Sequence, residues 1–227
     1  MYSKIVSQGK CTYCDKTFSP RGMITHLKNH LNAEQTANPT TEKAYFLNIK
    51  DEIYFLEVLV KGKAVFEELD TFLRDIWVEC CCHLSGFTDK QIKIDMSDKF
   101  QDILSTGLIF RYDYDYGSTT TFNLEVAGVY NIAINKNLVL LSRNEPLKLM
   151  CHICKEKPAV DICTTHMCIS DQYMFCSSCS KKHARKCDDF KDYSRMPVVN
   201  SPRMGVCGYT GGTIDVERDG VYKMEKK

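Results

Sequence analysis

Cysteine and histidine residues at the spacing of metal ligands occur near both ends of the sequence. Near the N-terminus, Cys11 and Cys14 are followed by His26 and His30. Thiolate and imidazole are the ligands that Zn²⁺ prefers, and four of them close a tetrahedral structural site. The spacing therefore predicts zinc binding at both ends of the chain. The candidates of the C-terminal group are Cys151, Cys154, Cys163, Cys168, Cys176, Cys179, His183 and Cys187, with His166 as a further candidate.

The N-terminal group resembles a two-cysteine, two-histidine zinc finger over residues 1–32. A β-hairpin would supply both thiolates, and a helix would present the two histidines one turn apart on one face. Arg21, Thr25 and Lys28 are the candidates for contact with nucleic acid. A lone finger covers about three base pairs, so the alternative is that these side chains form the solvated face of a structural or protein-binding finger.

The C-terminal block, over residues 148–192, holds enough ligands for two zinc ions, so the chain is expected to bind three in all. In an interleaved module, Cys151, Cys154, Cys176 and Cys179 would bind one ion. Cys163, His183 and Cys187 would bind the other, with either His166 or Cys168 as the remaining ligand. This block, including Pro158-Ala159-Val160, resembles the B-box and MYND class of zinc modules. That resemblance implies protein binding, and shells filled by cysteine favour a structural over a catalytic metal.

The charge distribution and the cysteine pattern limit the expected partners and the expected cellular compartment. The formal net charge of +1 predicts no general attraction to nucleic acid or membranes. The ends are locally basic, and Lys181, Lys182, Arg185 and Lys186 are further nucleic-acid candidates. The sequence shows no apolar signal segment and no apolar run of about 20 residues. Paired C-x2-C spacing without an export signal favours reduced, metal-bound thiols in the cytoplasm over disulfides.

Between the metal modules, the hydrophobic pattern predicts a domain of its own. Residues 33–43 are polar and contain a proline, which indicates a linker. Over residues 44–142, β-forming runs alternate with a helical pattern at 65–78 and a helical turn at 100–104. The expected strands cover 45–49, 53–60, 83–87, 108–116, 119–129 and 138–141. This order predicts an α+β fold, an antiparallel sheet with helices on one face, flanked by small zinc-stabilised modules. Residues 193–227 are expected to form a tail, either packed on this core or extended.

Two segments of the middle domain carry a family resemblance. His83-Leu84-Ser85-Gly86-Phe87 is one, and the strand Phe110 to Gly117 that leads to Leu124-Glu125 is the other. Together they resemble the plasmid ORF-three-like family, also known as insertion-element passenger proteins of TnpR type. The resemblance implies a strand-strand-helix α+β core and a link to mobile elements. Ser118, Thr120 and Phe122 stand where that family carries aspartate, tryptophan and histidine.

Other polar and thiol groups of the middle domain have two interpretations each. Asp113 and Asp115 alternate with tyrosines, so a strand would place both carboxylates on one face as a metal or acid–base pair. The alternative is a half-buried strand with its charges in water. The run Cys80-Cys81-Cys82 is interpreted as small buried apolar side chains. Cys207 is expected to be exposed, as a redox-sensitive thiol or an alternate ligand.

Three functions compete on this sequence. The first is a non-enzymatic zinc-binding adaptor that contacts proteins and whose finger would contact either a protein partner or nucleic acid. The second is a DNA- or RNA-binding regulator of a mobile element. The third is a metal-dependent hydrolase or nuclease that uses Asp113 and Asp115 with His83, and Glu125 if the sheet brings it close. The predominance of closed zinc shells favours the adaptor over an enzyme.

Overall fold

The computed structural model describes residues 5 and 7–213, which fall into two units. The first comprises residues 5, 74–82 and 146–213, and the second comprises residues 7–73 and 83–145. Residues 214–227 of the predicted tail lie outside the described part. Within that part, no helix combines the length and apolar composition needed to cross a membrane.

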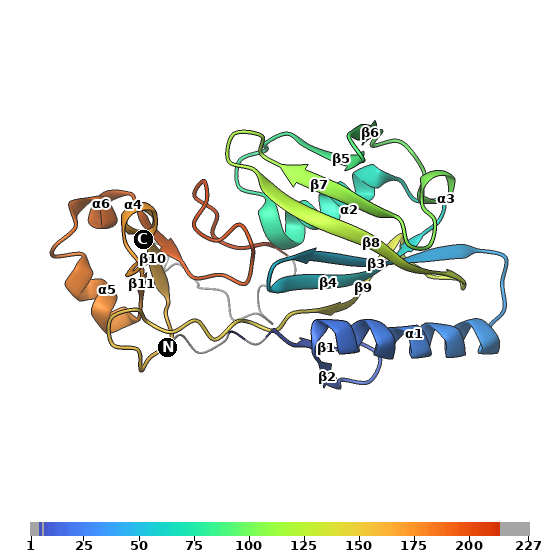
Figure 1. The fold of residues 1–227 in the computed structure, drawn as a ribbon, viewed down its shortest axis with the longest axis horizontal. Coiled ribbons are helices and arrows are strands. Elements are labelled where there is room, and N and C mark those ends of the chain that lie inside the picture. The colour runs from blue at the N-terminus through green and yellow to red at the C-terminus, as the bar shows by residue number, and fades with distance from the viewer. Residues whose placement is uncertain (1–4, 6, 214–227) are drawn as a thin grey trace. The chain divides into compact units, whose positions relative to one another are not determined.

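The second unit is built on a seven-stranded antiparallel sheet in the order β6-β5-β7-β8-β3-β4-β9, as Figure 1 shows. Its central strands are nearly continuous apolar runs because both faces of the sheet are covered. The α+β class and the antiparallel sheet are thus confirmed. The strands are β3 (Lys43–Asp51), β4 (Tyr54–Lys61), β5 (Ser85–Asp89), β6 (Ile92–Ile94), β7 (Ile109–Tyr114), β8 (Thr120–Asn131) and β9 (Leu138–Arg143).

One face of this sheet packs against α2 (Phe66–Leu73) and α3 (Phe100–Ile103). Phe66 of α2 lies at the centre of this contact, with ring centroids 4.9 Å from Phe100, 5.2 Å from Phe87 and 5.9 Å from Phe110. Edge-on aromatic contacts of this kind add to the free energy of burial. The predicted helix over 65–78 is divided, because residues Arg74–Val78 continue α2 as a π-helical turn.

The opposite face of the same sheet packs against α1 (Pro20–Ala37), the long blue helix of Figure 1. Met23, Leu27 and Leu31 recur every four residues, are fully buried, and share one core cluster with Phe46 and Phe55 of the sheet. The sequence predicted a linker from residue 33, but the helix continues to Ala37. The polar composition of residues 32–37 misled that prediction, because this end of the helix is largely exposed.

The first unit contains a small three-stranded antiparallel sheet in the order β11-β10-β12. A cross-strand contact stabilises this sheet: Arg195 of β12 donates two hydrogen bonds of 3.0 Å to the buried carboxylate of Asp161 on β10. Its elements are β10 (Asp161–Cys163), α4 (Thr164–Ile169), β11 (Met174–Phe175), α5 (Ser177–His183), α6 (Asp188–Asp192) and β12 (Arg195–Pro197).

Candidate metal centres

The N-terminal group forms where the hairpin of β1 (Gly9–Lys10) and β2 (Thr17–Phe18) meets α1. Potential ligand atoms of Cys11, Cys14, His26 and His30 all lie within 4.8 Å of one another. The Nε2 atom of His26 is 3.1 Å from both the Cys14 Sγ and the His30 Nε2. Burial, with the neighbouring His30, lowers the pKa of His26. The neutral imidazole that a metal requires is therefore favoured.

This finger is joined to the sheet of the second unit through its backbone. Both the amide and the hydroxyl of Thr12 donate to the carbonyl of Leu141 in β9, each at 3.0 Å. Gly9 lies so close to the sheet that a Cβ atom there would be 2.5 Å from Cζ of Phe55. Together with the buried face of α1, these contacts make the finger part of the sheet domain.

The first C-terminal group contains four thiols, those of Cys151, Cys154, Cys176 and Cys179. Cys151 and Cys154 lie on a tight turn of the same form as the turn at Cys11 and Cys14. In both turns the residue after the second cysteine has a positive φ, and its amide donates to the carbonyl of the first cysteine. Such knuckles turn two thiols toward one point, which is the arrangement that a tetrahedral metal site needs.

The thiol pKa values of this group reflect the crowding of four acidic groups. The hydroxyl of Ser178 and the amide of Cys179 lower the pKa of Cys176 to about 6, whereas burial and the neighbouring thiols raise that of Cys179 to about 12. One thiolate forms readily and makes the next more difficult to form. A divalent cation would remove this penalty.

The second C-terminal group contains Cys163, His166, His183 and Cys187. The Nδ1 atom of His166 is 3.2 Å from the Cys163 Sγ and 3.9 Å from the Cys187 Sγ. Cys168, the competing candidate, is exposed on α4 and lies outside the group. His183 stacks on Phe175 at 4.3 Å, and burial with the nearby His166 lowers its pKa. The pairs therefore interleave as the sequence predicted, with His166 in the contested position.

A fourth group, which the sequence did not predict, contains the thiols of Cys80, Cys81 and Cys207 in the first unit. The interpretation of Cys80–Cys82 as buried apolar side chains was wrong, because Cys81 and Cys82 are exposed and Cys80 is half-buried. Cys207 is exposed, as expected. Cys207 is 126 residues from Cys81 in the sequence, so no local ligand spacing could have predicted that their thiols lie close together. All thirteen cysteines lie in the described part of the chain, where none forms a disulfide.

The carboxylates proposed for a hydrolase do not converge. The strand ends at Tyr114 and Asp115 has φ of +63°, so the alternation that would place Asp113 and Asp115 on one face is broken. Asp113 accepts hydrogen bonds from Arg111 and Thr121 at 2.7 Å. Asp115 lies 3.5 Å from His83. Among the described residues, no group that could hold a metal contains either carboxylate.

Glu125, the further hydrolase candidate, is remote from both carboxylates. The register places Glu125 opposite Ile109 and Thr121 opposite Asp113. Glu125 therefore lies four residues, or about 13 Å, along β8 from the partner of Asp113. The sheet keeps these acidic groups apart.

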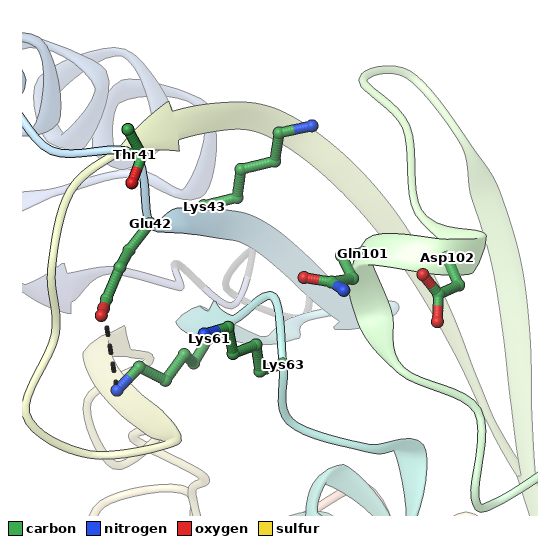
Figure 2. Close-up of a pocket in the computed structure, with 7 residues that line it drawn as sticks. All are labelled: Thr41, Glu42, Lys43, Lys61, Lys63, Gln101 and Asp102. Atoms are coloured by element: carbon green, nitrogen blue, oxygen red, sulfur yellow. Dashed lines mark ion pairs between the residues drawn. The ribbon is translucent and has the colours of Figure 1, made fainter.

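A pocket of about 410 Å³ in the second unit holds none of the predicted site residues. Figure 2 shows its charged lining, in which Lys61 pairs with Glu42 at 3.8 Å. Such a lining lacks the apolar surface that binds most small-molecule ligands. The lining residues are Thr41, Glu42, Lys43, Lys61, Lys63, Gln101 and Asp102.

The basic candidates lie on the surface. Arg21 and Thr25 are exposed on α1, and Lys28 is half-buried. Lys181, Lys182, Arg185 and Lys186 are all exposed at and just after the last turn of α5. Each set is available to solvent within its own unit.

Comparison with known proteins identifies no family. No family model and no curated protein matches this chain. Among solved structures, a protein of unknown function, MM3350, from Methanosarcina mazei Go1 is similar, with 17% sequence identity and a TM-score of 0.37. The match covers 45% of this chain and 68% of that one. A likeness this low carries no argument about function.

Proposed function

We propose that this protein is a non-enzymatic zinc-binding adaptor whose metal ions hold surfaces for protein partners. The observation that carries the proposal is the composition of the three predicted metal groups. Each offers four cysteine or histidine side chains and no carboxylate. Four protein ligands fill the tetrahedral shell of Zn²⁺ and leave no position for a water or a substrate. The ions would act as scaffold.

Exposed apolar side chains in the C-terminal module support protein binding. Large apolar groups at the surface mark interaction sites where they form one contiguous patch, and we propose that those of this module do so. Ile153 lies between the two cysteines of the turn Cys151–Cys154 and is exposed. Ile169 is the last residue of α4, and 73% of its surface is exposed. The exposed apolar residues of this module are Met150, Ile153, Met167 and Ile169, and the exposed Tyr193 follows directly after its last residue.

Substitution of Ile169 by aspartate tests this surface against a matched control. Ile92 on β6 is also an isoleucine with 73% exposure but belongs to the sheet domain. We expect Ile169→Asp to lose partners that the wild-type chain captures by cross-linking in cells, and Ile92→Asp to retain them. Both variants should keep the zinc content of the wild type. Equal capture by the two variants, with equal zinc, would refute the assignment of the partner surface to the module.

Nucleic-acid binding is the second candidate, favoured by the exposed basic cluster at the end of α5. Phosphate neutralisation by lysine and arginine makes binding fall steeply with salt. We expect a gel shift with duplex DNA or RNA at low salt to be weakened when Lys181, Lys182, Arg185 and Lys186 become alanine. Replacement of Arg21 and Lys28 by alanine would measure the contribution of the finger to the same gel shift. Absence of a shift at low salt would remove this candidate.

The cellular setting is proposed on the sequence alone. The resemblance of Tyr114-Asp115-Tyr116-Gly117 to the insertion-element passenger turn supports a role beside a mobile element or in the host response to one. Reduced thiols as ligands fit the cytoplasm. The test is co-purification of the endogenous protein with mobile-element components. Its absence would separate the adaptor from that setting.

A further inference from the structure

Three cysteine thiols of the first unit lie together outside the predicted metal modules. The Sγ atoms of Cys80 and Cys81 are 3.7 Å apart, and those of Cys81 and Cys207 are 3.5 Å apart. In a tetrahedral site with Zn–S bonds of about 2.3 Å, neighbouring sulfurs lie about 3.8 Å apart. A disulfide would require about 2.05 Å. The observed spacing is too long for a disulfide and matches the spacing of thiolates around an ion.

The local backbone explains how two consecutive cysteines can face one point. The π-helical turn Arg74–Val78 closes with the amide of Glu79 donating to the carbonyl of Arg74, and bends follow at Cys80 and Cys81. Consecutive side chains diverge on a strand but converge where the chain bends. Single π-helical turns of this kind are frequent at functional sites.

A buried guanidinium group lies beside these thiols. An Nη atom of Arg203, which is fully buried, is 3.5 Å from the Sγ of Cys80. Three thiolates, one neutral ligand and one Zn²⁺ carry a net charge of −1. A guanidinium hydrogen bond to a coordinating sulfur would offset that charge. This second-sphere contact is independent of the spacing of the sulfurs.

The segment that carries Cys207 is fastened to the π-helical turn at other points as well. The hydroxyl of Ser201 donates to the carbonyl of Trp77 at 2.6 Å, and the amide of Thr213 donates to the carbonyl of Asp75, also at 2.6 Å. The two donors flank Cys207 in the sequence, so these bonds fix the segment on both sides of that thiol. The thiol cluster is thus part of an ordered contact within the first unit.

We propose that Cys80, Cys81 and Cys207 bind a fourth zinc ion through their three thiolates, with one neutral ligand completing the shell. The site cross-links the tail to the π-helical turn, a role distinct from that of the predicted modules.

The exposure of this site predicts an ion that exchanges faster than the others. Cys81 and Cys207 are exposed, whereas Cys11, Cys151 and Cys163 of the other groups are buried. Solvent and chelators therefore reach this ion first. Removal of the fourth zinc should release the tail while the three predicted centres stay loaded.

Native mass spectrometry of the full chain, purified under reducing conditions with zinc, provides the test. We expect four zinc ions in the wild type and three in Cys207→Ser and Cys81→Ser. Cys82→Ser is the matched control, because Cys82 is adjacent and exposed but outside the group, and it should keep four. A brief exposure of the wild type to a mild chelator should remove one ion. Loss of that ion should leave Cys80, Cys81 and Cys207 open to alkylation.

Three outcomes would overturn the proposal. One is a zinc content that is the same in the wild type, in Cys207→Ser and in Cys81→Ser. Another is a reduced wild type in which the three thiols are alkylated equally fast with and without bound zinc, a measurement that does not depend on how the variants fold. The third is a purified chain lighter by two hydrogens with Cys81 joined to Cys207, which would assign the pair to disulfide chemistry.

Discussion

At the scale of single residues, the contested ligand of the C-terminal module illustrates what geometry adds to spacing. His166 and Cys168 are both on α4 and both fit the ligand pattern, but Cys168 is exposed outside the group while His166 contacts two of its sulfurs. The difference arises because helix residues two positions apart point to different sides. Spacing alone could not decide between them.

Replacement of each of these residues tests the assignment. We expect His166→Ala to lose one zinc ion and to lower the stability of the module, because metal binding and folding are coupled in small zinc domains. Cys168→Ser should keep both the ion and the stability. Zinc content by mass spectrometry and thermal unfolding measure the two effects. A loss of zinc in Cys168→Ser with none in His166→Ala would reverse the assignment.

A second residue-scale feature is the buried carboxyl of Glu57 on β4, on the sheet face that α1 covers. Burial raises its pKa well above the usual range, although the amide of Asn48 donates to Oε1 at 2.8 Å. Its Oε2 meets no hydrogen-bond donor among the described residues. The folded protein therefore holds this proton more tightly than the unfolded chain. The stability it contributes is fully present below the unfolded-state pKa of about 4.3 and is lost as the pH rises through the folded-state pKa.

The variant Glu57→Gln tests this pH dependence. Because it buries no charge, we expect it to gain about 1–3 kcal/mol over the wild type at pH 8, and the difference should shrink as the pH falls. Denaturant unfolding across this pH range is the measurement. Glu52→Gln, at an exposed turn of the same hairpin, is the control and should leave the pH profile unchanged. A profile that Glu57→Gln shares with the wild type would contradict the assignment.

At the scale of elements, the sheet was predictable and the attachment of the finger was not. Strong β-forming runs and a turn at Gly117-Ser118 indicated most strands within a few residues, whereas the three-residue β6 is too short to show a period. The predicted finger boundaries, residues 1–32, were based on the expectation that zinc would stabilise this segment as a small independent domain. Met23, Leu27 and Leu31 were available in the sequence as an apolar stripe, but the surface they cover belongs to strands far along the chain.

The variant Leu27→Ala tests whether the finger is part of the sheet domain. Leu27 is fully buried between α1 and the sheet, so truncation should cost about 2–5 kcal/mol. Hydrogen exchange should report faster opening of β3, β4 and β9 as well as of α1. Asn29→Ala, at an exposed position of the same helix, should change none of these rates. If only α1 lost protection in Leu27→Ala, the finger would be an independent module.

At the scale of the whole molecule, the proposed role of the metal ions is that of a structural scaffold. The sequence indicated three of the four groups because their ligands come in local pairs. The fourth group joins a local run to a cysteine far along the chain, and it became visible only in three dimensions. Function is harder to predict from the sequence than the metal groups are. A closed metal site stabilises a fold, and a fold does not identify the partner that it binds.

Zinc K-edge X-ray absorption of the zinc-loaded Cys207→Ser chain, which keeps the three predicted centres, tests the scaffold role most directly. We expect four-coordinate zinc with sulfur and nitrogen ligands only, at about two sulfurs for each nitrogen, and Zn–S distances of about 2.3 Å. Added azide, an anion that binds zinc at an open position, should leave the spectrum unchanged, because the shells are closed. An oxygen ligand from water or a carboxylate, or a spectrum that responds to the anion, would reveal an open site and contradict the scaffold role.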